Sequence, residues 1–133
     1  MAAQREVAHA GLAVNAERAL RSAVFPWEQL VATPTPAGSF RALFDAPTAT
    51  LGNFEGHATT LNPGAAPHPP HQHPDEELVI VKEGVLEVTI NGIVRPASAG
   101  AVLFIASNDL HGWRNAGTVP AAYYVFRFVT RSS

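Results

Sequence analysis

The sequence predicts an all-β fold, an antiparallel sandwich or barrel that follows a short N-terminal helix or arm. From Pro26 to the end, short apolar runs are separated by Gly, Pro, Asn and Asp at intervals of about ten residues, the pattern of an antiparallel sandwich or barrel. Of the 133 residues, 47% are hydrophobic and 15% are charged, which is typical of one folded globular domain. We therefore expect an arm over residues 1–26 and a single barrel domain over residues 27–133.

Residues 15–23 (NAERALRSA) are the one convincing helical stretch, because Asn15 can cap it and Ala, Glu, Arg and Leu are good helix formers. A helix this short is marginal in water, so we expect the arm either to fray or to dock on another surface. After it, a series of segments has the apolar patterning of short strands, in a number typical of a barrel. The predicted strands are residues 27–32, 39–44, 49–61, 76–82, 85–91, 93–97, 101–106, 110–115 and 121–130.

The turns between these strands have suitable chemistry. Glu83-Gly84 and Asn91-Gly92 offer residues that accept a positive φ, so we expect tight hairpins at both places. Five prolines make residues 62–74 a stiff, extended segment, which cannot be a central hydrogen-bonded strand throughout.

Two of the predicted strands are apolar on both faces. In EELVIVK (76–82), Leu78 and Ile80 alternate with Val79 and Val81, so something must cover the outer face as well. We therefore predict a homodimer, with residues 1–30 as a segment that crosses to the partner. On the last strand we expect one of two alternating sets inside the barrel and the other outside. The sets are Tyr124, Phe126 and Phe128, and Tyr123, Val125, Arg127 and Val129.

Composition excludes several kinds of function. The net charge of -2 offers no general attraction to the phosphates of a nucleic acid, and no apolar run reaches the roughly 20 residues that cross a bilayer. No phosphate loop, dinucleotide-binding glycine pattern or nucleophile elbow is present. The N-terminus lacks the apolar run of a secretory signal, so a cytoplasmic location is the default expectation; an extracytoplasmic one follows if a signal peptide was removed.

The absence of cysteine leaves oxygen and imidazole as metal ligands, and the chain has six histidines. In an extended segment His71 and His73 point to the same side, and Glu77 keeps that parity, whereas Glu76 points away. Two imidazoles and a carboxylate on one side form most of a facial metal site. His111, in a strand-like segment of the C-terminal half, is the natural fourth ligand.

The spacing His71-x-His73-x3-Glu77-x6-Gly84, followed by Gly100-x10-His111-x3-Asn115, resembles the two sequence motifs of the cupin family. These motifs are Gly-x5-His-x-His-x3,4-Glu-x6-Gly and Gly-x5-Pro-x-Gly-x2-His-x3-Asn. The resemblance covers roughly residues 50–130 and implies a double-stranded β-helix, the jelly-roll cupin barrel. It also implies that one divalent transition metal ion is bound, by the ligands His71, His73, Glu77 and His111.

The chain departs from the motifs at positions that are not ligands. The first glycine falls at Ala65, with Gly64 one position early, Ala106 replaces proline, and Asn108 replaces glycine. Because Asn tolerates the left-handed backbone conformation better than most residues, Asn108 can still make a tight turn before His111.

The resemblance implies a metal-dependent enzyme, dioxygenase-like or isomerase-like, that acts on a small polar organic molecule. The ion would be Fe, Mn, Ni, Co, Cu or Zn, and the sequence assigns no catalytic residue. The alternative is a non-catalytic module that binds a small molecule and holds the metal for structure, since no general base is obvious. His68 and His57 are candidate pocket residues, Trp113 is a candidate pocket wall, and His9 is expected to be incidental.

Overall fold

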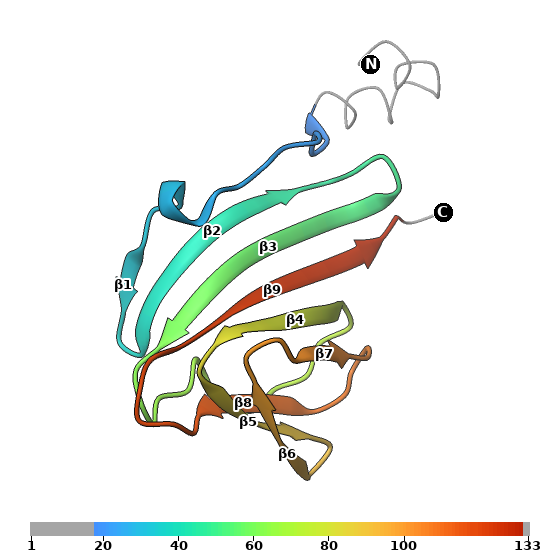
Figure 1. Ribbon diagram of the computed structural model, residues 1–133. Coiled ribbons are helices and arrows are strands. Elements are labelled where there is room, and N and C mark those ends of the chain that lie inside the picture. The colour runs from blue at the N-terminus through green and yellow to red at the C-terminus, as the bar shows by residue number, and fades with distance from the viewer. Residues whose placement is uncertain (1–17, 132–133) are drawn as a thin grey trace.

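The computed structural model describes residues 18–131, which form two antiparallel β-sheets (Figure 1). The strands are β1 (Thr33–Thr35), β2 (Gly38–Ala46), β3 (Leu51–Leu61), β4 (Glu76–Glu83), β5 (Val85–Ile90), β6 (Ile93–Ser98), β7 (Val102–Ile105), β8 (His111–Asn115) and β9 (Ala121–Thr130). The large sheet has the order β1-β2-β3-β9-β4-β7, and the small sheet has the order β6-β5-β8. The predicted all-β, jelly-roll class is confirmed.

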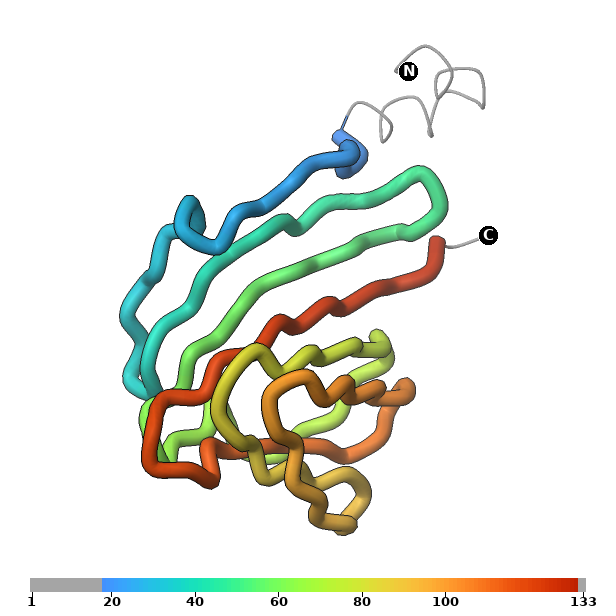
Figure 2. Tube along the Cα trace, viewed as in Figure 1, coloured from blue at the N-terminus to red at the C-terminus, as the bar shows by residue number. Residues whose placement is uncertain are grey.

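The core lies between the inner faces of the two sheets. The large sheet contributes side chains such as Leu61, Val79 and Tyr123, and the small sheet contributes Leu86 and Trp113. Figure 2 shows the long strands β2, β3 and β9 running side by side above the shorter strands of the small sheet. Burial of these side chains from both sheets is the main term that stabilises the fold.

The predicted alternation of side chains is present on both β4 and β9. On β9, Tyr123 and Val125 are buried in the core, whereas Tyr124 and Phe126 lie on the outer face. On β4, the inner face carries Glu77, a carboxylate only 3% exposed, and the core valines that follow it. This carboxylate on an otherwise apolar face marks where the core ends and the site begins.

Only one of the two predicted hairpin turns is a hairpin. Asn91 and Gly92 have φ values of 49° and 82° and join β5 to β6 in a two-residue turn, as predicted. Gly84 also has a positive φ, of 81°, but β4 pairs with β7 and β9 while β5 pairs with β6 and β8. The predicted hairpin at Glu83-Gly84 is therefore wrong, and Gly84 carries the chain from one sheet to the other.

The N-terminal predictions need two corrections. The predicted helix over residues 15–23 lies partly outside the described residues, and residues 19–26 are not helical. Residues 27–32 are not a strand, because Trp27–Gln29 form a 3-10 helix, η1, and the first strand is β1. Tertiary packing overrides local propensity here, since the Trp27 ring packs edge-on against Tyr124 at 5.8 Å.

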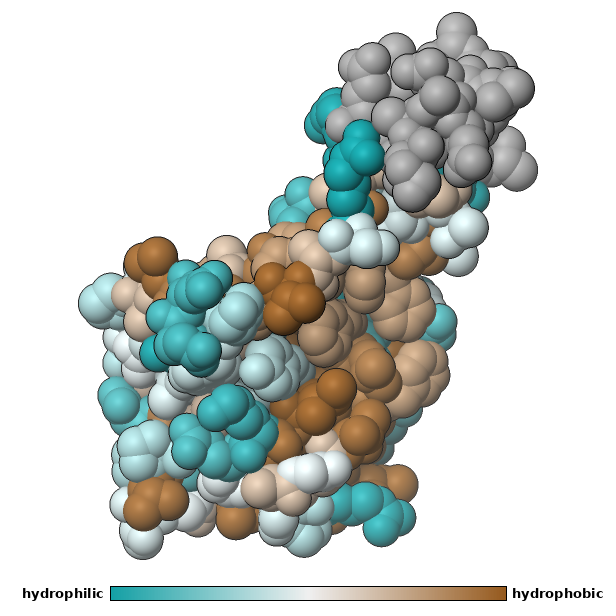
Figure 3. Space-filling model, turned by 45° about the horizontal axis from the view of Figure 1, so that its top comes forward, coloured by the Kyte–Doolittle hydropathy of each residue, from teal (hydrophilic) through white to brown (hydrophobic). Residues whose placement is uncertain are grey.

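Aromatic side chains cover much of the outer face of the large sheet. Phe44 lies 5.0 Å from Phe54 and 6.2 Å from Phe126, and Phe25 of the N-terminal segment packs on it at 5.4 Å. Figure 3 shows hydrophobic side chains gathered in one area of the visible surface. Among the described residues, no helix has the length and apolarity needed to cross a membrane.

Candidate metal centre

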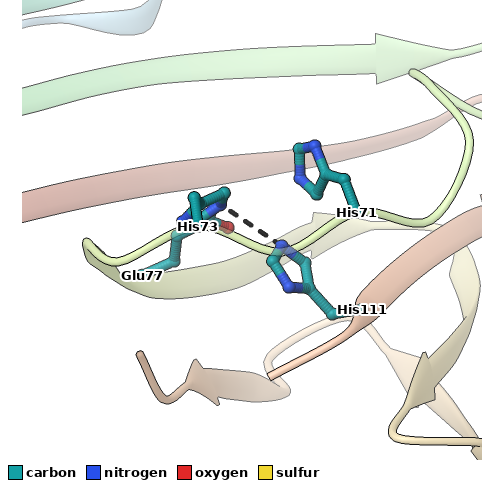
Figure 4. A group of neighbouring side chains, drawn as sticks. All are labelled: His71, His73, Glu77 and His111. Atoms are coloured by element: carbon teal, nitrogen blue, oxygen red, sulfur yellow. Dashed lines mark ion pairs between the residues drawn. The ribbon is translucent and has the colours of Figure 1, made fainter. Parts of the chain in front are cut away.

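Four side chains from three parts of the chain converge at one end of the core. His71 and His73 come from the proline-rich segment before β4, Glu77 from β4, and His111 from the start of β8. One potential ligand atom from each residue lies within 4.8 Å of the others, and Figure 4 shows the side chains around a common centre. The structure thus brings together all four residues that the sequence singled out.

Backbone hydrogen bonds fix the two segments that carry the histidines. His71 and His111 form an isolated antiparallel bridge between the proline-rich segment and the start of β8. The amide of Asn108 donates to the carbonyl of His73 at 2.8 Å, and Asn108 has a φ of 64°, as predicted for this turn. The positions of the histidines therefore depend on main-chain bonds rather than on side-chain packing alone.

Two of the imidazole rings are oriented by main-chain carbonyls. Nδ1 of His73 lies 2.8 Å from the carbonyl oxygen of Asp75, and Nδ1 of His111 lies 2.8 Å from that of Asp109. A carbonyl oxygen can only accept, so Nδ1 carries the proton in both rings. In the neutral rings Nε2 then has a free lone pair directed at the centre, which is the arrangement that metal-binding histidines use.

The centre contains buried polar atoms that lack hydrogen-bond partners among the described residues. These atoms are Nε2 of His73, Nε2 of His111 and Oε2 of Glu77. Nε2 of His73 is 2.8 Å from Oε1 of Glu77, although the contact is not aligned as a hydrogen bond. Since these imidazole nitrogens and the carboxylate are all acceptors, burying them together is costly unless a cation lies between them. Three nitrogens and one carboxylate fit a divalent transition metal.

The third imidazole is also suited to coordination. Burial is the main cause that lowers the pKa of His71 to about 4, and repulsion from Arg127, and from the neighbouring histidines whenever they are protonated, acts in the same direction. The ring is therefore neutral near pH 7, and a neutral imidazole is the form that binds a metal.

Glu76, the competing carboxylate, points away from the centre. Its Oε2 accepts a hydrogen bond of 3.3 Å from the amide of Ser107. The parity argument that favoured Glu77 over Glu76 agrees with this placement.

Sequence reasoning missed a charged pair beside the centre. Nε of Arg127 donates to Oδ2 of Asp75 at 2.7 Å and lies 3.7 Å from Oε1 of Glu77. Burial opposes ionisation of Asp75, but the hydrogen bond and the charge of Arg127, together with a backbone hydrogen bond, outweigh burial and lower the pKa of this carboxyl. The signal was present in the sequence, because Arg127 shares the inward parity of Tyr123 and Val125 on β9.

A cavity of about 390 Å³ adjoins the centre. His71 and Glu77 line it together with the three residues that the sequence left as pocket candidates, His57, His68 and Trp113. The His68 ring stacks on His71 at 3.9 Å between centroids. His9, by contrast, lies outside the described residues.

Most other residues that line this cavity are apolar or aromatic. They are Pro36, Ala37, Phe40, Leu61, Ala66, Pro67, Tyr123 and Val125, with Thr35, Ser39, Thr59 and Arg127 as the remaining polar residues. Burial raises the pKa of Tyr123 to about 12, so its hydroxyl remains protonated near neutral pH. The cavity can enclose a small organic molecule between apolar walls and the four converging side chains.

Comparison with known proteins identifies the family of this fold. The family model for a cupin domain matches residues 57–127. A cupin described as RmlC-like from Shewanella frigidimarina is 17% identical, with a TM-score of 0.67 over 84% of this chain and 95% of that one. A predicted oxalate decarboxylase from Thermotoga maritima is 16% identical, with a TM-score of 0.67 over 80% of this chain and 99% of that one.

The cupin domain of an XRE-family transcriptional regulator from Enterobacter cloacae is 28% identical, with a TM-score of 0.53 over 59% of this chain and 83% of that one. No curated protein matches the chain. At 16% and 17% identity the first two likenesses establish the fold and leave the reaction open.

Proposed function

The chain belongs to the cupin domain family, and on that premise we propose that it binds one divalent transition metal ion through His71, His73, Glu77 and His111. The observation that carries the proposal is the set of buried acceptor atoms, on His73, Glu77 and His111, that face one another without a hydrogen-bond donor. A cation at their centre would satisfy all of them. Iron, manganese, nickel, cobalt, copper and zinc all accept such a donor set.

The metal would bind and activate a small polar organic molecule in the adjoining cavity. A bound ion would supply Lewis acidity or a redox centre, with two positions of an octahedral shell left for that molecule. The chain's own residues would do the rest: the apolar walls exclude water, and Arg127 offers a positive charge for an anionic group. We favour a dioxygenase-like or isomerase-like enzyme.

Metal analysis and substrate screening together test this function. The protein should be purified without a nickel column and its metal content measured, and we expect about one transition metal ion per chain. Oxygen uptake with flavonols, diketones and catechols would then detect a dioxygenase, and proton NMR of small hydroxyketones and sugars would detect an isomerase. A protein that takes up no transition metal when all six ions are offered would contradict the proposal.

A second candidate function is a binding module without turnover. The similarity to the cupin domain of a transcriptional regulator, at 28% identity, favours this alternative. The same screen separates the two functions, because a module would bind a ligand and shift the melting temperature without consuming it. Turnover of any compound with any loaded metal would exclude the module.

A further inference from the structure

A second histidine and carboxylate pair lies beside the cavity, apart from the four converging side chains, and its histidine, His57, lines the cavity. On β3, Nδ1 of His57 lies 2.7 Å from Oε2 of Glu55, and the His57 ring stacks on Phe40 at 4.8 Å. We propose that His57, oriented by Glu55, accepts the proton of weakly acidic oxygen compounds, such as enols, hydroxyketones and hydroxamic acids, that enter the cavity. The proposal rests on the function above, because such compounds bind metal ions as their anions.

The contact with Glu55 determines which nitrogen of His57 can act. A carboxylate accepts hydrogen bonds and cannot donate them, so Nδ1 of His57 carries the proton. Nε2 then has the free lone pair, and it has no hydrogen-bond partner among the described residues. Stacking on Phe40 limits rotation of the ring. His57 thus offers a positioned base to the cavity that it lines.

The sheet places this base opposite the proposed metal ligands. Glu55 pairs with Arg127, and Arg127 pairs with Glu77, so these three residues form one row across β3, β9 and β4. His57 lies two residues further along β3, in the next row that faces inward, opposite Val125. Two strand spacings separate β3 from β4, or about 10 Å. A small organic molecule can bridge a distance of this order.

Several acidic side chains lie around His57. Glu55 is in direct contact on the same strand, and on its other side His57 lines a second cavity, of about 440 Å³, with Asp45 of β2 and Asp75. Arg127 of β9 is the one cation among the residues that line this second cavity, and it is paired with Asp75. Carboxylates therefore outnumber cations on this side of the His57 ring.

The proposed step balances without a further reactant. The O–H bond of the ligand breaks, an N–H bond forms at Nε2 of His57, and the ligand keeps the electron pair as an oxyanion. Glu55 stabilises the imidazolium that results, as a carboxylate does in other histidine dyads. The proton stays within the cavity instead of passing to the buffer.

Proton counting by calorimetry tests this step. The zinc-loaded protein is titrated with acetohydroxamic acid in two buffers of different ionisation enthalpy, at a pH of about 7.5, where an ordinary imidazole is mostly neutral. We expect the wild type to release almost no proton to the buffer and His57→Gln to release about one more per ligand bound. Glu55→Gln should fall between them. Glu87→Gln, which removes the carboxylate of an exposed ion pair with Arg114, is the matched control and should behave as wild type.

A measurement on the unmodified protein keeps the test independent of how the variants fold. Long-range proton–nitrogen NMR of the zinc-loaded protein with labelled histidine should show Nε2 of His57 unprotonated before acetohydroxamic acid is added and protonated afterwards. The inference fails, and the proposed function stands, if Nε2 of His57 remains unprotonated while acetohydroxamic acid is bound. The same holds if His57→Gln binds zinc and acetohydroxamic acid and releases as many protons as the wild type. If the wild type takes up no metal, the proposed function fails, and the inference with it.

Discussion

His71 and His111 hold each other through two backbone hydrogen bonds, one in each direction and each 2.9 Å long. The bonds form a single antiparallel bridge between the segment before β4 and the first residue of β8. Two residues that lie far apart in the sequence thus become direct neighbours whose rings are 4.8 Å apart between centroids. The bridge sets the separation of the proposed ligands before any metal binds.

Replacement of either bridged histidine should abolish metal binding and leave the barrel folded. In His71→Ala and His111→Ala the backbone bonds remain possible, but one of four ligands is lost. We expect less than stoichiometric metal by elemental analysis and an unchanged far-ultraviolet circular dichroism spectrum. The wild type should gain about 2.7 kcal/mol of stability at a free metal concentration roughly 100 times Kd, and the variants should not. Full metal occupancy in both variants would refute the ligand assignment.

Two adjacent glutamates provide a closely matched comparison. Glu77→Gln removes an inward carboxylate that is 3% exposed, whereas Glu76→Gln changes a side chain that faces Ser107 on the other side of β4. We expect Glu77→Gln to lower metal affinity by about a hundredfold or more, because a neutral amide is a poor ligand, and Glu76→Gln to keep it within about threefold. Competition with a chromophoric chelator measures both. Equal losses in the two variants would contradict the parity argument.

Asn115 should matter for stability rather than for metal binding. It is fully buried, its amide nitrogen donates to the carbonyls of Leu61 and Val119 at 3.0 and 2.8 Å, and its oxygen accepts from the amide of Gly117 at 2.9 Å. Asn115→Leu leaves these three main-chain groups unpaired, so we expect the free energy of unfolding to fall by about 3 kcal/mol.

The control for Asn115 is Asn53→Ala, which removes one exposed hydrogen bond to Asp45 and should cost less than about 1 kcal/mol. Urea denaturation of the metal-free proteins measures both changes. A similar loss in the two variants would show that the buried hydrogen bonds of Asn115 contribute little.

Sequence reasoning succeeded where a short-range pattern was sufficient. Alternation divided β9 into two sets, of which the structure buries the one with Tyr123 and Val125, and it brought Glu77 rather than Glu76 to the histidines. It also predicted the positive φ of Asn108. Each of these inferences depends on parity or on turn chemistry, which neighbouring residues alone determine.

The sequence was insufficient where the outcome depends on distant partners. Gly84 has a positive φ, as a turn glycine should, but its presence in the sequence does not indicate that the following strand, β5, belongs to the other sheet. Trp27 sits between the cations of Arg41 and Lys82, at 4.3 and 4.2 Å, and those contacts replace the expected strand with η1. Glu55 and His57 lie on the more polar face of β3, and the opposite face is the more apolar one, so parity could not show that the polar face lines the cavity.

The outer face of the large sheet supports the predicted homodimer. β7 is an edge strand, and its Val102 and Phe104 are 62% and 54% exposed. They pair with Ile80 and Leu78 of β4, so the four side chains form one continuous apolar strip. We predict that two chains associate through this strip, since an exposed apolar edge strand tends to pair with another chain.

For the wild type we therefore expect light scattering at micromolar concentration to give the molecular mass of two chains. For Phe104→Asp we expect the mass of one chain, because burying an unpaired carboxylate in the interface is costly. Ile93→Asp is the matched control, since Ile93 is 60% exposed on β6 of the other sheet, and it should leave the dimer intact. A wild type that is monomeric at this concentration would refute the dimer, and dissociation by Ile93→Asp instead of Phe104→Asp would move the interface to the small sheet.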